Sequence, residues 1–131
     1  MKKIIFLACL LSPMTGAFAQ TADQKIYVHD QLIMVSNQLN SSLPVNVGNG
    51  TRIDRTAVFH DTLQYSGTVV KPEDYDIKKI KKDLEQQVIQ KMKTDPKYQP
   101  FRENRVTIWY VFRDLEGRQL INLVITPENY L

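Results

Sequence analysis

The strongest pattern in the chain lies in residues 105–127, where apolar side chains alternate along two segments. One face of the first segment carries Val106, Ile108, Tyr110 and Phe112, and one face of the second carries Ile121, Leu123 and Ile125. Period-two alternation of β-branched and aromatic residues predicts two strands. Gly117, near a polar turn, and Pro127, after the second strand, are typical of a hairpin that ends there. Because both faces of this hairpin are apolar, we expect it in the middle of a sheet, covered by helices or a partner.

Two further stretches have apolar residues at helical spacing. The first stripe, within residues 22–43, consists of Val28, Leu32, Val35 and Leu39, and the second consists of Ile77, Ile80, Leu84, Val88 and Met92. Spacings of three and four place such residues on one side of an amphipathic helix. We expect the first helix to end before Pro44. The second should begin at an N-cap, Asp74 or Asp76, and end before Pro96.

A second, weaker hairpin is predicted from strands at residues 51–59 and 62–70, with a turn at His60-Asp61. Residues 46–50, which include two glycines, are predicted as the loop before it. The order helix, hairpin, helix, hairpin (αββαββ) predicts an α+β fold in which a four-stranded antiparallel sheet packs against two helices. In an alternative arrangement, one helix covers each side of the central hairpin.

Residues 1–19 have the form of a secretory signal peptide: two lysines, an apolar run at 4–11, and a small-x-small site that ends at Ala19. We expect cleavage after Ala19, which leaves residues 20–131 as a single α+β domain in the periplasm or outside the cell. An uncleaved membrane anchor is disfavoured because a span needs about 20 apolar residues. A lipoprotein acylated at Cys9 is disfavoured because little apolar sequence precedes this cysteine.

Charge and cysteine content narrow the classes of function. The chain has 17 basic and 14 acidic residues, a formal net charge of +3, and removal of the two leader lysines brings the mature domain to +1. A chain this close to neutrality lacks the basic footprint of a nucleic-acid binder. Cys9 is the only cysteine, so the mature domain has no disulfide, thiol nucleophile or cysteine metal site.

The sequence offers few residues for catalysis. His29-Asp30 and His60-Asp61 invite a metal-site interpretation, but such a site needs three or four convergent ligands and the chain has two histidines. No serine lies in a glycine-flanked elbow, and the glycines at 48–50 precede a strand, not a helix that binds phosphate. We therefore expect no catalytic residue, no cofactor and no metal, in a protein that is not an enzyme.

Candidate partner-binding residues are charged or large amphipathic side chains on or beside strands: Arg52, Asp54, Arg102, Arg105, Trp109 and Tyr110. Arg52 and Asp54 share a strand face, so they can pair with each other or across to the other hairpin. The arginines on or beside strands, which also include Arg55 and Arg113, are interpreted first as part of a structural ion-pair network and second as a patch that binds an acidic partner. Trp and Tyr dominate interface hot spots, although in mid-strand at least one of Trp109 and Tyr110 belongs to the core.

The second helix has a lysine-rich face that includes Lys78, Lys79, Lys81 and Lys82. Such a face suits either water or anionic lipid headgroups. Because Asp83 and Glu85 are interspersed with the lysines, we favour a solvated face over peripheral contact with a membrane.

Several short motifs are spread over residues 37–117. They are Asn37-Gln38-Leu39-Asn40 with Leu43-Pro44, Thr51-Arg52-Ile53-Asp54, Thr62-Leu63-Gln64-Tyr65, Thr94-Asp95-Pro96, and Val106-Thr107 followed by Tyr110-Val111-Phe112-Arg113-Asp114 and Gly117. Together they resemble a loosely defined group of small exported or membrane-anchored bacterial proteins of uncharacterised function. The resemblance implies an extracytoplasmic α+β domain and no known reaction. Many such proteins carry a cysteine before the Asp-Pro step and another near the C-terminus, where this chain has Lys93 or Thr94 and Tyr130 or Leu131.

These observations predict a non-enzymatic, exported protein-binding domain. An accessory factor of an envelope assembly or secretion system, with another envelope protein as its partner, fits best. One alternative is a periplasmic inhibitor or immunity protein that presents residues 46–50 or 95–103 to a target. Another is a small acid–base hydrolase that uses an Asp or Glu with His60. A pocket with convergent titratable groups would favour the hydrolase, and an exposed apolar or arginine-rich surface would favour a binding domain.

Overall fold

The computed structural model describes residues 24–48 and 50–131, so the predicted cleavage site after Ala19 and Cys9 both lie outside the described residues. The elements in chain order are α2 (Gln24–Asn40), β1 (Val45–Gly48), β2 (Thr51–Phe59), β3 (Thr62–Val69), the 3-10 turn η1 (Pro72–Asp74), α3 (Ile77–Thr94), the 3-10 turn η2 (Pro96–Tyr98), α4 (Gln99–Glu103), β4 (Thr107–Arg113), β5 (Gln119–Ile125) and α5 (Pro127–Tyr130). Within these residues, no helix has both the length and the apolar character that crossing a membrane requires.

The strands of the described residues form one five-stranded sheet in the order β1-β2-β3-β4-β5. Neighbouring strands are antiparallel except β3 and β4, which run parallel with Leu63 opposite Ile108 and Tyr65 opposite Tyr110. The α+β class is therefore confirmed. The predicted four-stranded, purely antiparallel sheet is wrong in both strand number and direction.

Two features of the chain account for the difference. Between β3 and β4 the chain forms α3, whose 18 residues span about 27 Å. This crossover returns the chain to the end of the sheet where β3 began, so β4 must run parallel to β3. In addition, Val45 pairs with Ile53 and Asn46 with Arg52, so part of the predicted loop at 46–50 is the short edge strand β1.

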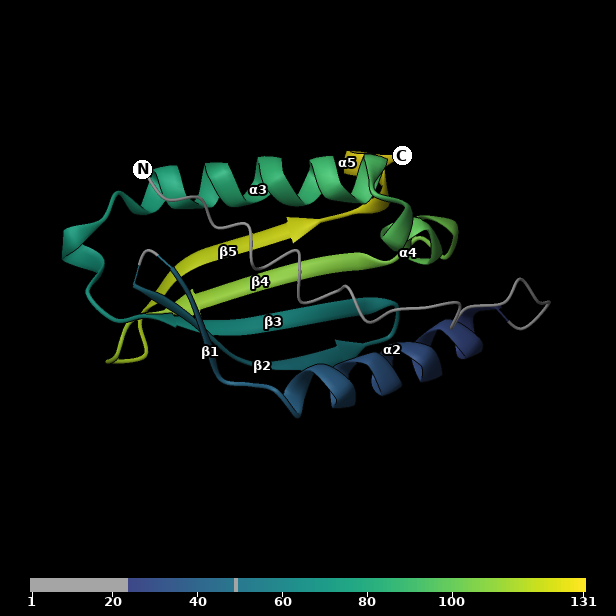
Figure 1. Cartoon of the computed structure of the whole chain (residues 1–131), viewed down its shortest axis with the longest axis horizontal. Helices are drawn as coiled ribbons and strands as arrows, with labels where there is room; N and C mark the ends of the chain where they lie inside the picture. Colours follow the sequence, from purple (N-terminus) through teal and green to yellow (C-terminus); the bar gives the residue numbers. More distant parts are fainter. Residues whose placement is uncertain (1–23, 49) are drawn as a thin grey trace.

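Both long helices pack on one face of the sheet. The predicted apolar stripes of α2 and α3 belong to a single buried cluster with the strand residues Leu63, Tyr65, Ile108, Tyr110 and Leu123. Figure 1 shows α2 running along the β2 side of the sheet and α3 along the β5 side. The alternative with one helix on each side of the central hairpin is therefore wrong, and the sheet has a helix-covered face and an opposite face.

Polar contacts stabilise the end of α2 and the start of α3. Asn40 at the end of α2 donates from Nδ2 to the carbonyl of Thr56 (3.1 Å), and its Oδ1 accepts from the backbone N–H of Thr56 (2.7 Å). Because these bonds satisfy both backbone groups of Thr56, the last turn of α2 is attached to β2. At α3, the N-cap is Asp76, whose side chain accepts from the backbone N–H of Lys79 (3.2 Å), while Asp74 ends η1.

Candidate protein-binding surface

The face of the sheet opposite the helices, which we call the outer sheet face, is the candidate binding surface. Cross-strand register places a set of side chains on it: Arg52, Asp54, Arg55, Ala57, Phe59, Gln64, Ser66, Thr68, Trp109, Val111, Arg113, Asn122 and Val124. In the described part of the chain, both long helices pack on the other face. Of these side chains, Val111 and Thr68 are buried, whereas Arg55, Phe59, Arg113, Asn122 and Val124 are exposed and available to a partner.

One end of the outer sheet face is apolar and aromatic. Phe59 is 49% exposed and Val124 is 47% exposed, with the half-buried Trp109 between them. The rings of Phe59 and Trp109 have centroids 6.0 Å apart at a tilt of 54°, and Trp109 donates from Nε1 to Oδ1 of Asn122 (2.6 Å). This bond satisfies the indole N–H and holds the ring in one orientation.

The other end of the outer sheet face carries an ion pair within a hydrogen-bonded cluster. Arg52 Nε lies 2.5 Å from Asp54 Oδ1, and Thr68 donates from Oγ1 to Asp54 Oδ2 (2.7 Å). Arg52 also donates from Nη2 to Thr68 Oγ1 (3.3 Å). The predicted pairing of Arg52 with Asp54 is therefore present. A β-bulge between Ile53 and Arg55 places Arg55 on this face as well, opposite Ser66.

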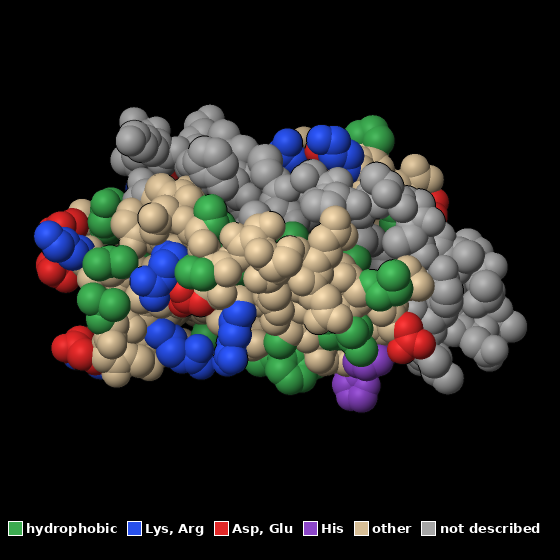
Figure 2. Space-filling model, turned by 60° about the horizontal axis from the view of Figure 1, so that its bottom comes forward, with side chains coloured by type: hydrophobic (Ala, Val, Ile, Leu, Met, Phe, Trp, Pro, Cys, Tyr) green, Lys and Arg blue, Asp and Glu red, His purple; other side chains and the backbone are tan. Residues whose placement is uncertain are grey.

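Two more arginines near this cluster have no acidic partner. Arg55 and Arg113 are exposed, and neither belongs to an ion pair within residues 24–48 and 50–131. With Arg52 they give the outer sheet face three guanidinium groups against the single carboxylate of Asp54. In Figure 2, a group of basic and acidic side chains lies at the left of the displayed face, and histidine lies at the lower right. Hydrophobic side chains occupy part of the surface between these two places.

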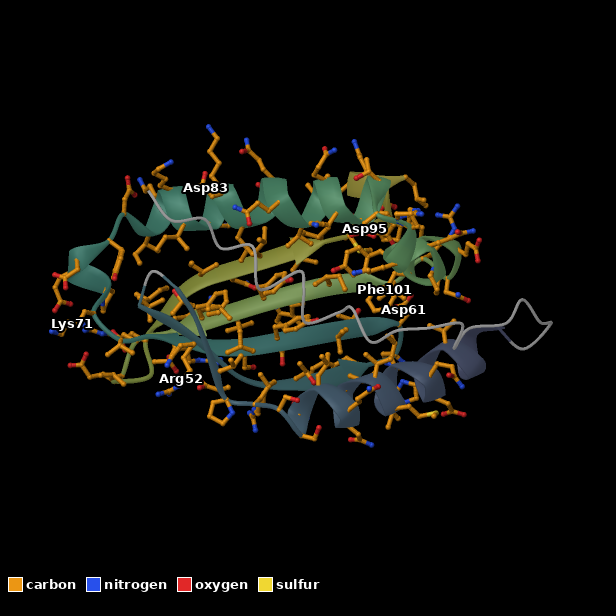
Figure 3. The ribbon with its side chains drawn as sticks, viewed as in Figure 1. Arg52, Asp61, Lys71, Asp83, Asp95 and Phe101 are labelled. Atoms are coloured by element: carbon orange, nitrogen blue, oxygen red, sulfur yellow. The ribbon has the colours of Figure 1, made fainter. Side chains whose placement is uncertain are left out.

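The remaining predicted partner-binding residues lie elsewhere. Arg102 donates from Nη1 to the carbonyls of Met92 (2.7 Å) and Asp95 (2.9 Å), so it caps the C-terminal end of α3. Arg105 is exposed in the turn after α4, with φ of 53°. Figure 3 shows Phe101 of α4 and Asp61 at one end of the molecule and Arg52 at the other. The structure therefore does not bring Arg102 and Arg105 together with Arg52.

Tyr110 is in the core, as strand alternation predicts for one of the two adjacent aromatic residues. Its ring stacks on Tyr65 with centroids 5.0 Å apart, and both side chains are fully buried. Burial raises the pKa of both hydroxyls, so they stay protonated at neutral pH. Only Arg52, Asp54 and Trp109 of the predicted set share the outer sheet face.

Phe59 and Val124 also lie on this face and were not predicted as binding residues, and Arg55 and Arg113 were considered only as members of the arginine group. The signal for them was the parity of strand positions, because residues an even number of positions from Trp109 or Arg52 share a face within a regular strand. That signal was ambiguous because apolar residues occupy both faces of the central strands. The bulge in β2 also changes the parity at Asp54, which moves Arg55 to the same face as Arg52.

The structure brings the two histidines near each other at an exposed position. His29 of α2 lies with Nδ1 2.9 Å from the carbonyl oxygen of His60, in the β2–β3 turn. His60 has φ of 55°, a turn conformation. Within the described residues, no three His, Cys, Asp or Glu side chains gather so as to hold a metal ion. The contact connects α2 to the β2–β3 turn.

The lysine-rich face of α3 is exposed, including Lys78, Lys79, Lys81 and Lys82. Lys79 Nζ lies 3.3 Å from Asp83 Oδ2, one turn further along the helix. Figure 3 shows Asp83 pointing away from the sheet. Exposed pairs of this kind are worth little in stability, and this face is separate from the outer sheet face.

Residues 29–121 match the family described as Domain of unknown function (DUF8479). The chain belongs to this family. Its fold is similar to that of EpsS, the pilotin of the Vibrio vulnificus type 2 secretion system, with a TM-score of 0.69 and 10% identity over 85% of this chain and 98% of that one. It is also similar to a candidate secreted protein from Pseudomonas aeruginosa, with a TM-score of 0.67 and 9% identity over 86% of this chain and 100% of the other.

A third similar structure is AspS, the type II secretion system pilotin from Vibrio cholerae, with a TM-score of 0.63 and 14% identity over 82% of this chain and 96% of that chain. No curated protein matches this chain in sequence. Identities this low show a shared fold alone.

Proposed function

We propose that this member of the family is a non-enzymatic accessory factor of a secretion system that acts by binding another protein of the cell envelope. The main support is the likeness of fold to two pilotins of type II secretion systems, which extends over 98% and 96% of those chains. We further propose that residues 20–131 work in the periplasm after cleavage behind Ala19, because the sequence before this site has the order of a signal peptide.

The surface that we assign to partner binding is the outer sheet face. Its support is the combination of an oriented tryptophan, two half-exposed apolar side chains and unpaired arginines, since Trp and Arg are enriched among residues that dominate binding energy. An inhibitor that presents residues 46–50 or 95–103 has no comparable support, because these segments hold β1, η2 and α4. The proposal assigns no reaction to the protein.

Crosslinking in the periplasm followed by affinity purification and mass spectrometry tests this function. We expect the wild-type protein to recover a component of a secretion apparatus. The Trp109→Ala variant, checked for unchanged circular dichroism, should recover much less of it. A matched control is Met34→Ala, because Met34 is 63% exposed on α2, away from the outer sheet face. The proposal fails if both variants and the wild type recover no specific envelope protein.

A further inference from the structure

We propose that the outer sheet face binds an acidic, amphipathic segment of its protein partner, with carboxylates at Arg55 and Arg113 and an apolar side chain against Trp109 and Phe59. This inference rests on the proposed function and names the chemistry of the partner. Its basis is the arrangement of charge and apolar surface on one sheet face that no described helix covers.

The arginines provide the first part of the argument. Arg52 is already engaged by Asp54 and Thr68, whereas Arg55 and Arg113 have no ion pair among the described residues. These two residues lie on β2 and β4, which are separated by β3, and their pairing partners on β3, Ser66 and Thr68, are two residues apart. Two strand spacings and this offset of about 7 Å along the strands together give a separation of about 12 Å. A guanidinium group offers a planar donor pair that matches a carboxylate. Two separated acidic side chains on one partner segment can therefore satisfy both arginines.

The aromatic end provides the second part. Trp109 and Arg113 are four residues apart on β4, which corresponds to about 13 Å along the strand. The partner segment should therefore carry an apolar side chain and a carboxylate about 13 Å apart. In an extended segment this separation takes about four residues, and in a helix it takes about nine residues.

An anionic membrane is a less suitable ligand for this face. The carboxylate of Asp54 lies within the arginine cluster, where it would be brought against lipid phosphates of like charge. The indole N–H of Trp109 is already bonded to Asn122, so it is not free for the interfacial hydrogen bonds that membrane tryptophans make. A protein segment can place its carboxylates beside Arg55 and Arg113 and avoid Asp54, whereas a uniformly anionic surface cannot.

The test begins by locating the partner segment. A photo-crosslinking amino acid is introduced at Val124 in the full chain, and at Met34 as the comparison position, and the crosslinked partner peptide is identified by mass spectrometry. The peptide found at Val124 is synthesised and titrated into the purified protein. Trp109 is the only tryptophan in the chain, so its fluorescence reports binding at the outer sheet face directly.

We expect the peptide captured at Val124 to contain acidic residues at the spacing given above. Its affinity should fall at least about tenfold in the double variant Arg55→Glu with Arg113→Glu, and should weaken with added salt. The Arg55→Lys with Arg113→Lys variant keeps the charge and should lose less. Lys78→Glu with Lys82→Glu on α3 is the matched charge-reversal control, and it should stay within about twofold of wild type.

Three results would overturn the inference. The first is a captured peptide without acidic residues, and the second is an unchanged affinity in the double glutamate variant. The third is wild-type binding to phosphatidylglycerol vesicles that the double variant loses, which would assign the face to lipid. Capture of a secretion component at Met34 and not at Val124 refutes this inference and leaves the proposed function standing, whereas capture of no protein at either position refutes both.

Discussion

Gly67 of β3 determines how closely the neighbouring strands and rings approach each other. A Cβ atom at this position would lie 2.4 Å from the carbonyl oxygen of Arg52 and 2.4 Å from Cε1 of Phe112. Because one of these atoms is backbone, it cannot rotate away. We expect Gly67→Ala to destabilise the fold by about 1–3 kcal/mol through overpacking. Urea unfolding measures this, with Ser66→Ala on the outer sheet face as a control, and equal stabilities for the two variants would contradict it.

The buried tyrosines differ in how their hydroxyls are satisfied. Within the described residues, the hydroxyls of Tyr65 and Tyr110 have no hydrogen-bond partner. Tyr130 donates to the carbonyl of Val106 at 2.6 Å. We expect Tyr65→Phe to leave stability unchanged or to raise it by up to about 1 kcal/mol, because it removes an unsatisfied buried group. Tyr130→Phe should cost about 1–3 kcal/mol. Chemical denaturation of both variants measures their free energies of unfolding. A larger loss of stability for Tyr65→Phe than for Tyr130→Phe would contradict this expectation and show that the Tyr65 hydroxyl is hydrogen-bonded.

Asp114 in the β4–β5 turn makes stability depend on pH. Its burial raises its pKa, but hydrogen bonds from the backbone N–H groups of Arg118 and Glu116 and from the Arg118 guanidinium outweigh this, so the pKa lies below the ordinary 3.8. Stability from this carboxylate is present above pH 3.8 and is lost as the pH falls through the lower folded-state pKa. We expect Asp114→Asn to flatten the stability profile between about pH 2 and pH 4. Urea midpoints across this range test it, and an unchanged slope would contradict it.

At the residue scale, the alternation of apolar residues predicted which side chains are buried. It did not predict the register in which the strands pair. The positions Val106, Ile108, Tyr110 and Phe112 are all buried, as the period of two predicts. Trp109 has the opposite parity and lies on the outer sheet face. The pairing of the strands determines which residues of β2 lie near Trp109. This pairing joins segments that are distant in sequence, so no local pattern predicts it.

At the scale of elements, Arg102 shows how a predicted surface residue can have a structural role. Its guanidinium bonds two carbonyls at the end of α3, those of Met92 and Asp95. We expect Arg102→Ala to destabilise the protein by about 1.5–3 kcal/mol, because these bonds involve a charged donor. Partner capture by the folded fraction should not change. Thermal melts and the capture assay test this together, with Lys97→Ala in η2 as an exposed control, and normal stability with lost capture would make Arg102 a contact residue.

Helices were more predictable than strand pairing. The apolar stripe of α3 and its N-cap at Asp76 are both present, and α2 ends at Asn40 before Pro44. Such features are local, so the sequence carries them. The strand β1 was not predicted because it has only four residues, ends in a glycine and forms a strand only through pairing with β2. The parallel β3–β4 pair depends on the crossover by α3, which is a property of the whole topology.

At the scale of the whole molecule, the proposed binding surface exists because both long helices of the described residues pack on the other face of the sheet. Substitutions on the outer sheet face should therefore separate binding from stability. We expect Arg55→Glu with Arg113→Glu to shift the free energy of unfolding by less than about 0.5 kcal/mol, as exposed substitutions usually do. The same variant should lose partner capture. Parallel urea unfolding and capture experiments test this, and a strong loss of stability would mean that the arginines support the fold.

The sequence predicted which residue types form the candidate surface, but it did not predict the full set of residues that share it. Residue types indicated arginine and tryptophan, and three of the predicted residues, Arg52, Asp54 and Trp109, share one face. Arg102 and Arg105 were grouped with them because they also flank a strand in the sequence. Arg102 lies within α4 and Arg105 in the turn that follows it. Phe101 of the same helix lies at the opposite end of the molecule from Arg52 (Figure 3). Proximity in sequence to a strand did not indicate which end or face of the sheet a side chain occupies.

Hydroxyl-radical footprinting of the purified protein, with and without the envelope partner recovered by crosslinking, tests the central claim most directly. The account predicts that Trp109 and Phe59 on the outer sheet face become protected from oxidation when the partner binds. Met34 on α2, which is 63% exposed, should react equally in both samples. Protection of Met34 with unchanged oxidation of Trp109 and Phe59 would contradict the account, because the partner would then bind the helical face.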